Sequence, residues 1–208
     1  MASKKCTIAM LICIGTASIF STCKKGGILG CHESFAYTID AKVYPDKDTV
    51  NIGDTIFVEV NFPTTLTNST PGEIANLNGA SGIATDMGFV KLVNDSPIVL
   101  DNAVPDFNFK LIKGREVAPT KHDTTLIKSF FFEEANNMVL FKLAIIPKNI
   151  GTYSFNIGAS PDVEEKNVRC PTFTLNYLLR NTTDQHYYLY PGGAGVTPDA
   201  ADYYFYVK

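Results

Sequence analysis

The chain has 208 residues, in which 21 acidic residues outnumber 18 basic ones and give a formal net charge of −3. This balance, without a basic stripe, argues against a nucleic-acid-binding surface, so we expect no nucleic-acid partner. The length allows one domain with a substantial core, and hydrophobic residues make up 45% of the chain.

The first 22 residues are predicted to be a secretory signal peptide and not part of the fold. Lys4 and Lys5 form a basic start, Cys6–Phe20 is an apolar run, and small residues precede Cys23. A basic start, a short apolar core and a small-residue cleavage site are the pattern of such a signal. The cysteine at the cut indicates a lipoprotein signal, in which Cys23 becomes the acylated first residue and its lipid holds the protein at a membrane.

Other interpretations of this segment stay open. The apolar run is shorter than the roughly 20 apolar residues that span a bilayer, but an ordinary signal peptide and a retained anchor are alternatives. Ile28–Cys31 also resembles a lipoprotein box, although it would place Lys24 and Lys25 inside the apolar region. The stretch Phe20–Cys23 resembles the signals of Bacteroidetes lipoproteins. This resemblance implies a lipid-anchored cell-envelope protein at the outer membrane, with the leaflet that it faces left open.

Two further cysteines remain after cleavage. Cys31 lies just before the first predicted strand and Cys170 just before a late one. If those strands lie side by side and parallel, their starts are close enough to bridge, and disulfides persist in an oxidising compartment. We therefore predict a Cys31–Cys170 disulfide, with two free thiols as the alternative.

From residue 35 onward the hydrophobic period is two, which predicts half-buried antiparallel strands bounded by turn residues. Residues 23–34 are predicted to be a tether, and 35–208 a single β-sandwich domain with a tyrosine-rich C-terminal extension at about 179–208. Pro63–Asp86 is predicted to be a long loop. The predicted strands are Phe35–Val43, Ile56–Phe62, Phe107–Leu111, Leu126–Phe132, Val139–Ile145, Tyr153–Ile157, Phe173–Tyr177 and Tyr203–Val207.

Two connections between predicted strands indicate a more specific architecture. Asp46–Asp54 resembles the entry of immunoglobulin-like bacterial domains, where a short strand and a Gly-Asp turn precede a long strand. Asn149–Tyr153 resembles the corner before strand F, where a tyrosine hydroxyl bonds back to the upstream backbone. The resemblance covers about residues 35–178 and implies an all-β, immunoglobulin-like antiparallel sandwich with Tyr153 as a structural tyrosine corner.

The sequence shows no catalytic motif, and we expect no enzyme activity, metal or cofactor. His32, His122 and His186 lack metal-ligand spacing. Asp162 and Glu164 belong to an acidic cluster that is interpreted as a solvated loop, with a weak calcium site as the alternative. A hydrolase whose groups meet only in space remains open.

Six of the ten tyrosines fall in the last 22 residues. Rigid aromatic side chains are common recognition anchors, and sugar rings stack on them. The interpretation that we favour is structural: the core covers one face of the last strand, and the segment Tyr187–Pro191 covers the other. The possible ligand surface consists of Tyr187, Tyr188, Tyr190, Tyr204 and Tyr206.

Together these features predict a membrane-anchored, non-enzymatic envelope lipoprotein that acts as a binding or accessory module for a protein or glycan partner. The alternative is a structural subunit of a pilus- or adhesin-type surface assembly, in which the terminal strand Tyr203–Lys208 adds to the sheet of a neighbour. An envelope hydrolase is the third and least favoured hypothesis.

Overall fold

A computed structural model describes residues 35–67, 74–93, 99–118, 127–167, 173–190 and 199–208. Ser34–Lys208 forms one compact unit. The signal peptide, Cys23, Cys31 and the tether lie outside the described residues, as do Cys170, His32 and His122.

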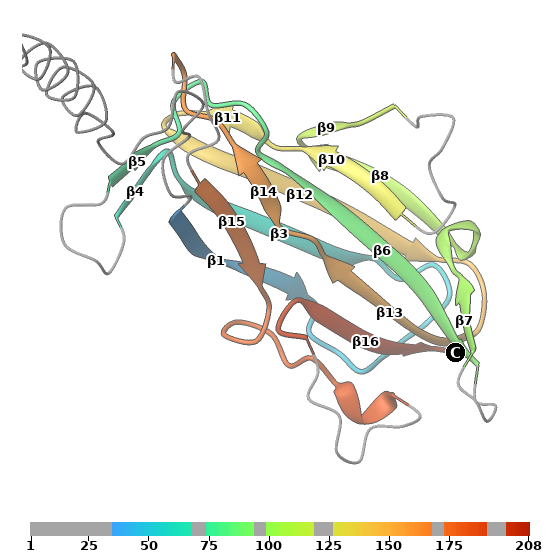
Figure 1. Cartoon of the computed structure of the whole chain (residues 1–208). Helices are drawn as coiled ribbons and strands as arrows, with labels where there is room; N and C mark the ends of the chain where they lie inside the picture. The colour runs from blue at the N-terminus through green and yellow to red at the C-terminus, as the bar shows by residue number, and fades with distance from the viewer. Residues whose placement is uncertain (1–34, 68–73, 94–98, 119–126, 168–172, 191–198) are drawn as a thin grey trace, which may run out of the picture. The chain divides into compact units, whose positions relative to one another are not determined.

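The described residues are all-β, as the sequence predicts, with two 3₁₀ turns, η1 (Val104–Asp106) and η2 (Tyr187–Leu189), between strands (Figure 1). The strands are β1 (Phe35–Tyr44), β2 (Thr49–Val50), β3 (Ile56–Pro63), β4 (Thr65–Thr67), β5 (Ile74–Asn76), β6 (Ala84–Val93), β7 (Val99–Asn102), β8 (Phe107–Lys113), β9 (Arg115–Glu116), β10 (Ile127–Phe131), β11 (Glu133–Ala135), β12 (Met138–Pro147), β13 (Gly151–Ile157), β14 (Ser160–Val163), β15 (Phe173–Leu178) and β16 (Asp202–Val207).

Two large sheets make up the domain. In sheet I the order is β11-β12-β3-β1-β15-β14, and β8 pairs with β12. In sheet II the order is β2-β16-β13-β6-β10-β9, and β7 pairs with β6. Most neighbours are antiparallel, but β1 runs parallel to β15 and β2 runs parallel to β16. The strands β4 and β5 pair with each other and form a separate two-stranded sheet.

The hydrophobic residues that alternate along the sequence form the inward face of each sheet. On β3, Ile56, Val58, Val60 and Phe62 are all buried, while the residues between them are partly or fully exposed. Alternate side chains of a strand point to opposite faces, so this pattern places one hydrophobic row against the other sheet.

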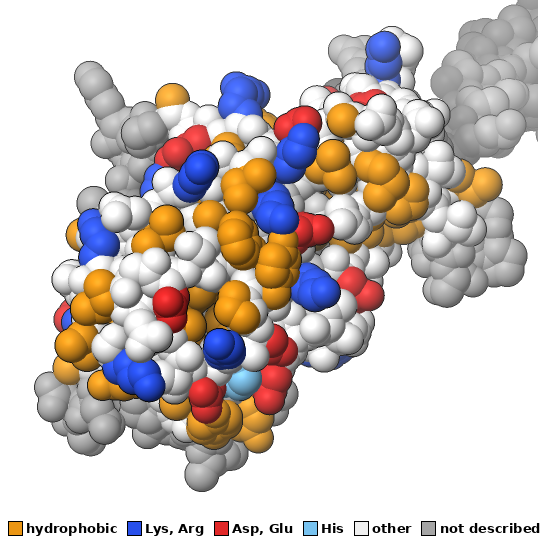
Figure 2. Space-filling view, turned by 180° about the vertical axis from the view of Figure 1, so that it is seen from behind, with side chains coloured by type: hydrophobic (Ala, Val, Ile, Leu, Met, Phe, Trp, Pro, Cys, Tyr) orange, Lys and Arg blue, Asp and Glu red, His pale blue; other side chains and the backbone are white. Residues whose placement is uncertain are grey.

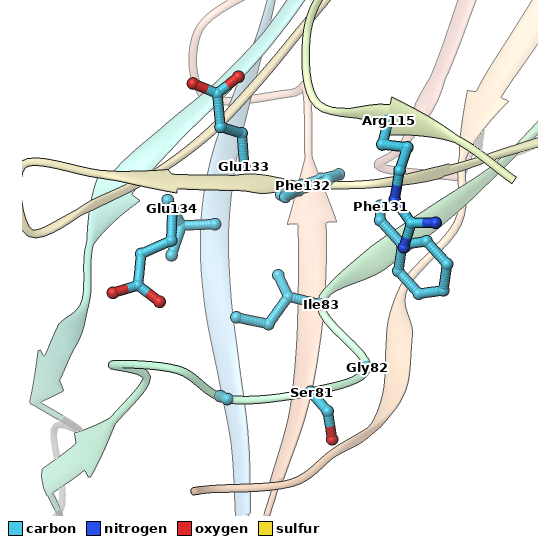
Figure 3. A pocket seen from close by; sticks show the side chains of 10 residues that line it. Ser81, Gly82, Ile83, Arg115, Phe131, Phe132, Glu133 and Glu134 are labelled. Carbon is cyan, nitrogen blue, oxygen red and sulfur yellow. The ribbon is translucent and has the colours of Figure 1, made fainter.

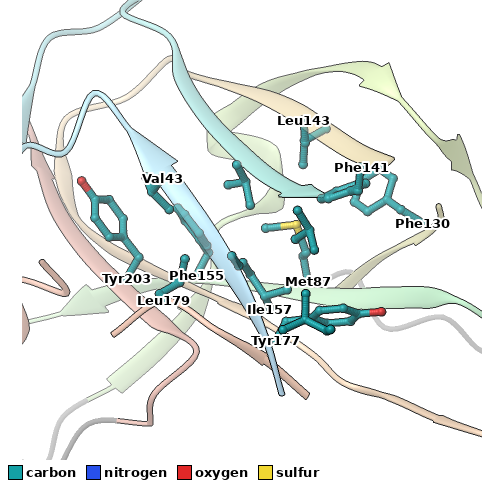
Figure 4. Close-up of a cluster of buried hydrophobic side chains, with 14 of the residues drawn as sticks. Val43, Met87, Phe130, Phe141, Leu143, Phe155, Ile157, Tyr177, Leu179 and Tyr203 are labelled. Carbon is teal, nitrogen blue, oxygen red and sulfur yellow. The ribbon is translucent and has the colours of Figure 1, made fainter. Parts of the chain in front are cut away.

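The core lies between the two sheets and is rich in aromatic side chains (Figure 4). Phe89 of β6 meets Phe109 of β8 with ring centroids 4.9 Å apart, and Phe130 of β10 meets Phe141 of β12 at 5.4 Å. Each pair joins sheet II to sheet I. Edge-to-face and offset contacts of this kind stabilise the packing beyond the area that they bury.

The segment Pro63–Asp86 differs from the predicted long loop. It contains β4 and β5, and its last residues begin β6, the central strand of sheet II. The hairpin is tied to the fold because Leu66 and Ala75 are buried in the core cluster. The sequence prediction of a loop was wrong here because the apolar residues are few and widely spaced.

Candidate functional site

A groove of about 240 Å³ opens on sheet II, over the neighbouring strands β6, β13 and β16. We call it the tyrosine groove. The lining residues that matter for its chemistry are Gly88, Ser154, Asn156, Tyr190, Asp202 and Tyr204.

The register of the three strands explains why these residues meet. Asn156 of β13 pairs with Gly88 of β6 on one side and with Asp202 of β16 on the other. Ser154, two residues earlier on β13, pairs with Tyr204 in the same way. Residues two apart on a strand share a face, so the side chains of these rows lie on the same side of sheet II.

The two tyrosines of the groove stand against each other. The rings of Tyr190 and Tyr204 are 6.0 Å apart in an edge-to-face arrangement. Tyr204 is buried and donates its hydroxyl hydrogen to Asp202 Oδ2 at 3.1 Å, while Tyr190 is half-buried. The groove therefore combines an aromatic wall with a carboxylate.

Burial is the main cause of the pKa shifts of Asp202 and Tyr204 in the groove. Burial raises the pKa of Asp202, against a smaller lowering by the Tyr204 hydroxyl. Burial, with help from the Asp202 charge, also raises the pKa of Tyr204. Both shifts follow from the cost of holding a negative charge away from water.

The amide of Asn156 is held in one orientation. The backbone N–H of Gly88 donates to Asn156 Oδ1 at 2.9 Å, and a Cβ on Gly88 would lie 2.6 Å from that oxygen. A backbone N–H can only donate, so the atom facing it is the amide oxygen and the NH₂ group points elsewhere. Glycine at position 88 is what permits this approach.

The other tyrosines of the predicted ligand surface lie outside the groove. Tyr187 and Tyr188 are exposed on η2, and Tyr206 is 38% exposed further along β16. The Tyr188 hydroxyl donates to the Asp48 carboxylate, which fixes that ring beside β2. The structure thus brings together only Tyr190 and Tyr204 of the five predicted residues.

A histidine joins the C-terminal extension to the loop after β1. His186 is buried, with its Nε2 atom 3.1 Å from Asp46 Oδ1 and its Nδ1 atom 3.6 Å from Asp184 Oδ2. Among the residues that the structure describes, Nε2 has no aligned hydrogen-bond partner, and the ring packs edge-on against Tyr203 at 5.5 Å. This arrangement holds the C-terminal extension against the loop after β1 and is not a set of metal ligands.

Tyr153 occupies the position that the corner prediction gave it. Its side chain is buried, and its hydroxyl lies 3.2 Å from the Asn149 carbonyl oxygen and 2.9 Å from Asp106 Oδ2. Burial, reinforced by Asp106, raises the pKa of Tyr153. Asp106, from η1, is a partner that sequence reasoning missed.

A second hollow of about 390 Å³ lies between the segment before β6 and the strands β9–β11 (Figure 3). Arg115 stacks over Phe131, with the guanidinium carbon 4.8 Å from the ring centroid. Glu133 and Glu134 are consecutive on β11 and point in different directions, so the two carboxylates do not converge. Glu134 is also held by the backbone N–H of Gly79 at 2.7 Å.

The exposed surface carries charges of both signs. Figure 2 shows hydrophobic side chains interspersed with basic and acidic ones. On β1 and β3, Tyr44 stacks on Phe57 at 5.2 Å, and Lys142 lies over both rings and 3.2 Å from Glu59. These side chains therefore find their partners within sheet I.

Among the described residues, no group of three or more His, Cys, Asp or Glu side chains is placed to hold a metal ion. The same part of the chain contains no helix with the length and apolar character needed to cross a membrane. Comparison with protein-family models, with curated proteins and with solved structures finds no match to this chain.

Proposed function

We propose that this protein is a lipid-anchored, non-enzymatic binding module of the cell envelope that holds a glycan in the tyrosine groove. The observation that supports this function is the groove itself, where Tyr190 and Tyr204 stand beside Asp202 and Asn156. Aromatic rings suit the apolar faces of sugars, while carboxylate and amide groups suit their hydroxyls. A concave site with a few convergent polar groups is the usual form of a small-ligand site.

The anchor belongs to the proposal as well. Acylation at Cys23 would place the domain at the outer membrane at the end of a tether of about ten residues, reaching at most roughly 3.5 Å per residue. The resemblance to Bacteroidetes lipoproteins supports this location.

An immunoglobulin-like arrangement of the domain is also part of the proposal. Four strands of sheet I follow the order β1-β3-β12-β8, and three of sheet II follow β16-β13-β6. These orders match the A-B-E-D and G-F-C arrangements of that architecture, and the parallel β2–β16 pair resembles an additional A′ strand. Strands β14 and β15 extend sheet I beyond this pattern.

The pairing of the last strand does not favour assembly by strand donation. β16 pairs with β13 along its length and with β2 near its end. The backbone N–H of Tyr204 also donates to the Gln185 carbonyl at 3.1 Å, on the edge that β2 leaves open. A strand paired in this way has little free edge to offer a neighbour.

The proposal is tested with the full chain in detergent micelles on an array of neutral and acidic oligosaccharides. We expect neutral oligosaccharides to bind, and Tyr190→Ala to remove that binding because the aromatic wall is lost. Tyr187→Ala, outside the groove, is the matched control and should bind like the wild type. If no glycan binds the wild type, the glycan function fails and a protein partner becomes the remaining hypothesis.

A further inference from the structure

The tyrosine groove contains two hydrogen-bonding groups that its own side chains leave partly unused. Asn156 Oδ1 is occupied by the Gly88 N–H, but within the described part of the chain the amide hydrogens of Asn156 have no acceptor. The Asp202 carboxylate accepts from Tyr204 at Oδ2 and also from the backbone of Asp199, but an ionised carboxylate has about four lone-pair sites and can accept further hydrogen bonds. The amide hydrogens of Asn156 thus stand beside a carboxylate that can accept a further hydrogen bond.

The distance between these groups is set by the sheet. Asn156 and Asp202 are direct partners across the β13–β16 pair. Side chains that oppose each other in an antiparallel pair have Cβ atoms about 4.5–5.5 Å apart. Both groups can therefore reach neighbouring atoms of one small ligand.

A pair of hydroxyls on adjacent carbons complements this arrangement. One hydroxyl donates to the carboxylate, and its neighbour accepts from the amide. Because each hydroxyl both donates and accepts, the pair satisfies the carboxylate and the amide together.

We propose that the tyrosine groove binds two neighbouring hydroxyls of one neutral sugar ring, one on Asp202 and one on Asn156, with the ring beside Tyr190. This inference rests on the proposed glycan-binding function and names the ligand class and the two polar residues that select it.

The charge of Asp202 and the volume of the groove restrict the class of ligand further. An acidic sugar would bring its carboxylate toward Asp202, where like charges repel. The groove of about 240 Å³ lies just below the range of about 300–1,000 Å³ that holds drug-sized ligands, which suits a single ring. Burial raises the pKa of Asp202, and a ligand hydroxyl that donates to the carboxylate would stabilise its charged form.

Three substitutions test the pair. Asn156→Asp keeps an oxygen for the Gly88 N–H but removes the amide donors. Asp202→Asn keeps the shape but removes the charged acceptor. Gly88→Ala leaves Asn156 and Asp202 chemically unchanged but puts a Cβ against Asn156 Oδ1, which must shift the amide. Asn108→Asp on β8 and Asp162→Asn on β14, both exposed on sheet I, are matched controls.

Binding is measured on the full chain in micelles by saturation-transfer NMR. The probes are the methyl glycosides of glucose, galactose and mannose, with monodeoxy forms of each and N-acetylneuraminic acid. We expect at least one neutral glycoside to bind, and each groove variant to weaken it about tenfold or more, as loss of a charge-assisted or buried hydrogen bond does. Removing one hydroxyl of the recognised pair from the probe should have a similar effect, and the controls should not differ from wild type.

The outcomes separate the two proposals. If a neutral glycoside binds but Asn156→Asp and Asp202→Asn bind it equally well, the hydroxyl-pair inference is wrong and the glycan function stands. If only N-acetylneuraminic acid binds, the neutral-ligand inference is wrong. If neither these probes nor the array oligosaccharides bind, both proposals fail. Thermal unfolding of each variant distinguishes lost binding from lost folding, and Asp202→Asn should not destabilise, because burial disfavours the charge it removes.

Discussion

The Tyr153 hydroxyl meets the carboxylate of Asp106 at 2.9 Å, although 47 residues separate the two in the chain. The same carboxylate accepts the side-chain amide of Asn149 at 2.5 Å, and the backbone N–H of Lys148 donates to the Asp106 carbonyl at 2.8 Å. The corner before β13 is therefore held to η1 and not only to its own backbone.

The first prediction concerns this contact. Tyr153→Phe removes only the hydroxyl, so Asp106 Oδ2 and the Asn149 carbonyl lose a donor, and we expect a loss of about 1–3 kcal/mol in the free energy of unfolding. Urea denaturation measures it. Tyr206→Phe, on the partly exposed face of β16, is the control and should stay within about 0.5 kcal/mol of wild type.

A double-mutant cycle apportions the effect. If Asp106 is the main partner, Asp106→Ala and Tyr153→Phe together should cost less than the sum of the single changes. Equal unfolding midpoints for wild type and Tyr153→Phe would show that the hydroxyl contributes nothing to the corner.

The sequence predicts the strands well where apolar residues strictly alternate. Ile56, Val58, Val60 and Phe62 alternate without a break, and all four are buried as expected. Strand β6 was not predicted from the sequence. Its inward row includes Thr85, which is polar but buried, and Gly88 interrupts its outward row, so its hydrophobic period is weak.

The candidate site is harder to predict than the strands. Tyr190 and Tyr204 stand out in the sequence as part of an aromatic cluster. Gly88, Asn156 and Asp202 carry no signal, because they meet only through the register of three strands that are far apart in the chain. Which strands pair is decided by packing of the whole domain, and a local pattern does not contain it.

The second prediction is the Cys31–Cys170 disulfide. The condition set by the sequence was that the strands after these cysteines run side by side and parallel. β1 and β15 do so, with Phe35 paired to Phe173. The cysteines themselves, four and three residues upstream, lie outside the described residues.

We expect mass spectrometry of non-reduced peptides to recover Cys31 and Cys170 in one linked species. Reduction should lower the free energy of unfolding by up to roughly 5 kcal/mol, since the bridge closes a long loop. Cys31→Ser should have the same effect as reduction, and reduction should then do nothing further. Two separate, alkylated peptides from unreduced protein would exclude the bridge.

The third prediction is acylation of Cys23. Cells that make the protein are labelled with a clickable palmitate analogue, and the wild type should carry label while Cys23→Ala does not. Cys31→Ala is the matched control, because Ile28–Cys31 is the rival lipoprotein box. If Cys31→Ala loses the label and Cys23→Ala keeps it, the acylated residue is Cys31. Equal label in the wild type and both variants would contradict the lipoprotein hypothesis.

The last prediction concerns pH and the contact between Tyr188 and Asp48. The hydrogen bond to Asp48 raises the pKa of Tyr188 to about 12 from an ordinary 10.0, and the same bond lowers the pKa of Asp48 below 3.8. The folded state thus holds the Tyr188 proton more tightly than the unfolded chain does. The stability from this contact is present below about pH 10 and is lost as the pH rises through about 12. On the acid side it is present above the ordinary pKa of Asp48 and is lost as the pH falls below it.

Asp48→Asn tests both limbs, because it keeps an oxygen for the Tyr188 hydroxyl but removes the charge. The difference in urea midpoint between wild type and Asp48→Asn should be constant from about pH 5 to pH 9 and should shrink at pH 3 and above pH 11. Ring-labelled tyrosine NMR, with Tyr188→Phe to assign the signal, should show Tyr188 titrating closer to 10 in Asp48→Asn. Asp101→Asn, an exposed change on β7, should leave that titration where it is in the wild type. A midpoint difference that does not vary with pH would mean that Asp48 and Tyr188 are neighbours in the fold without being linked in their protonation.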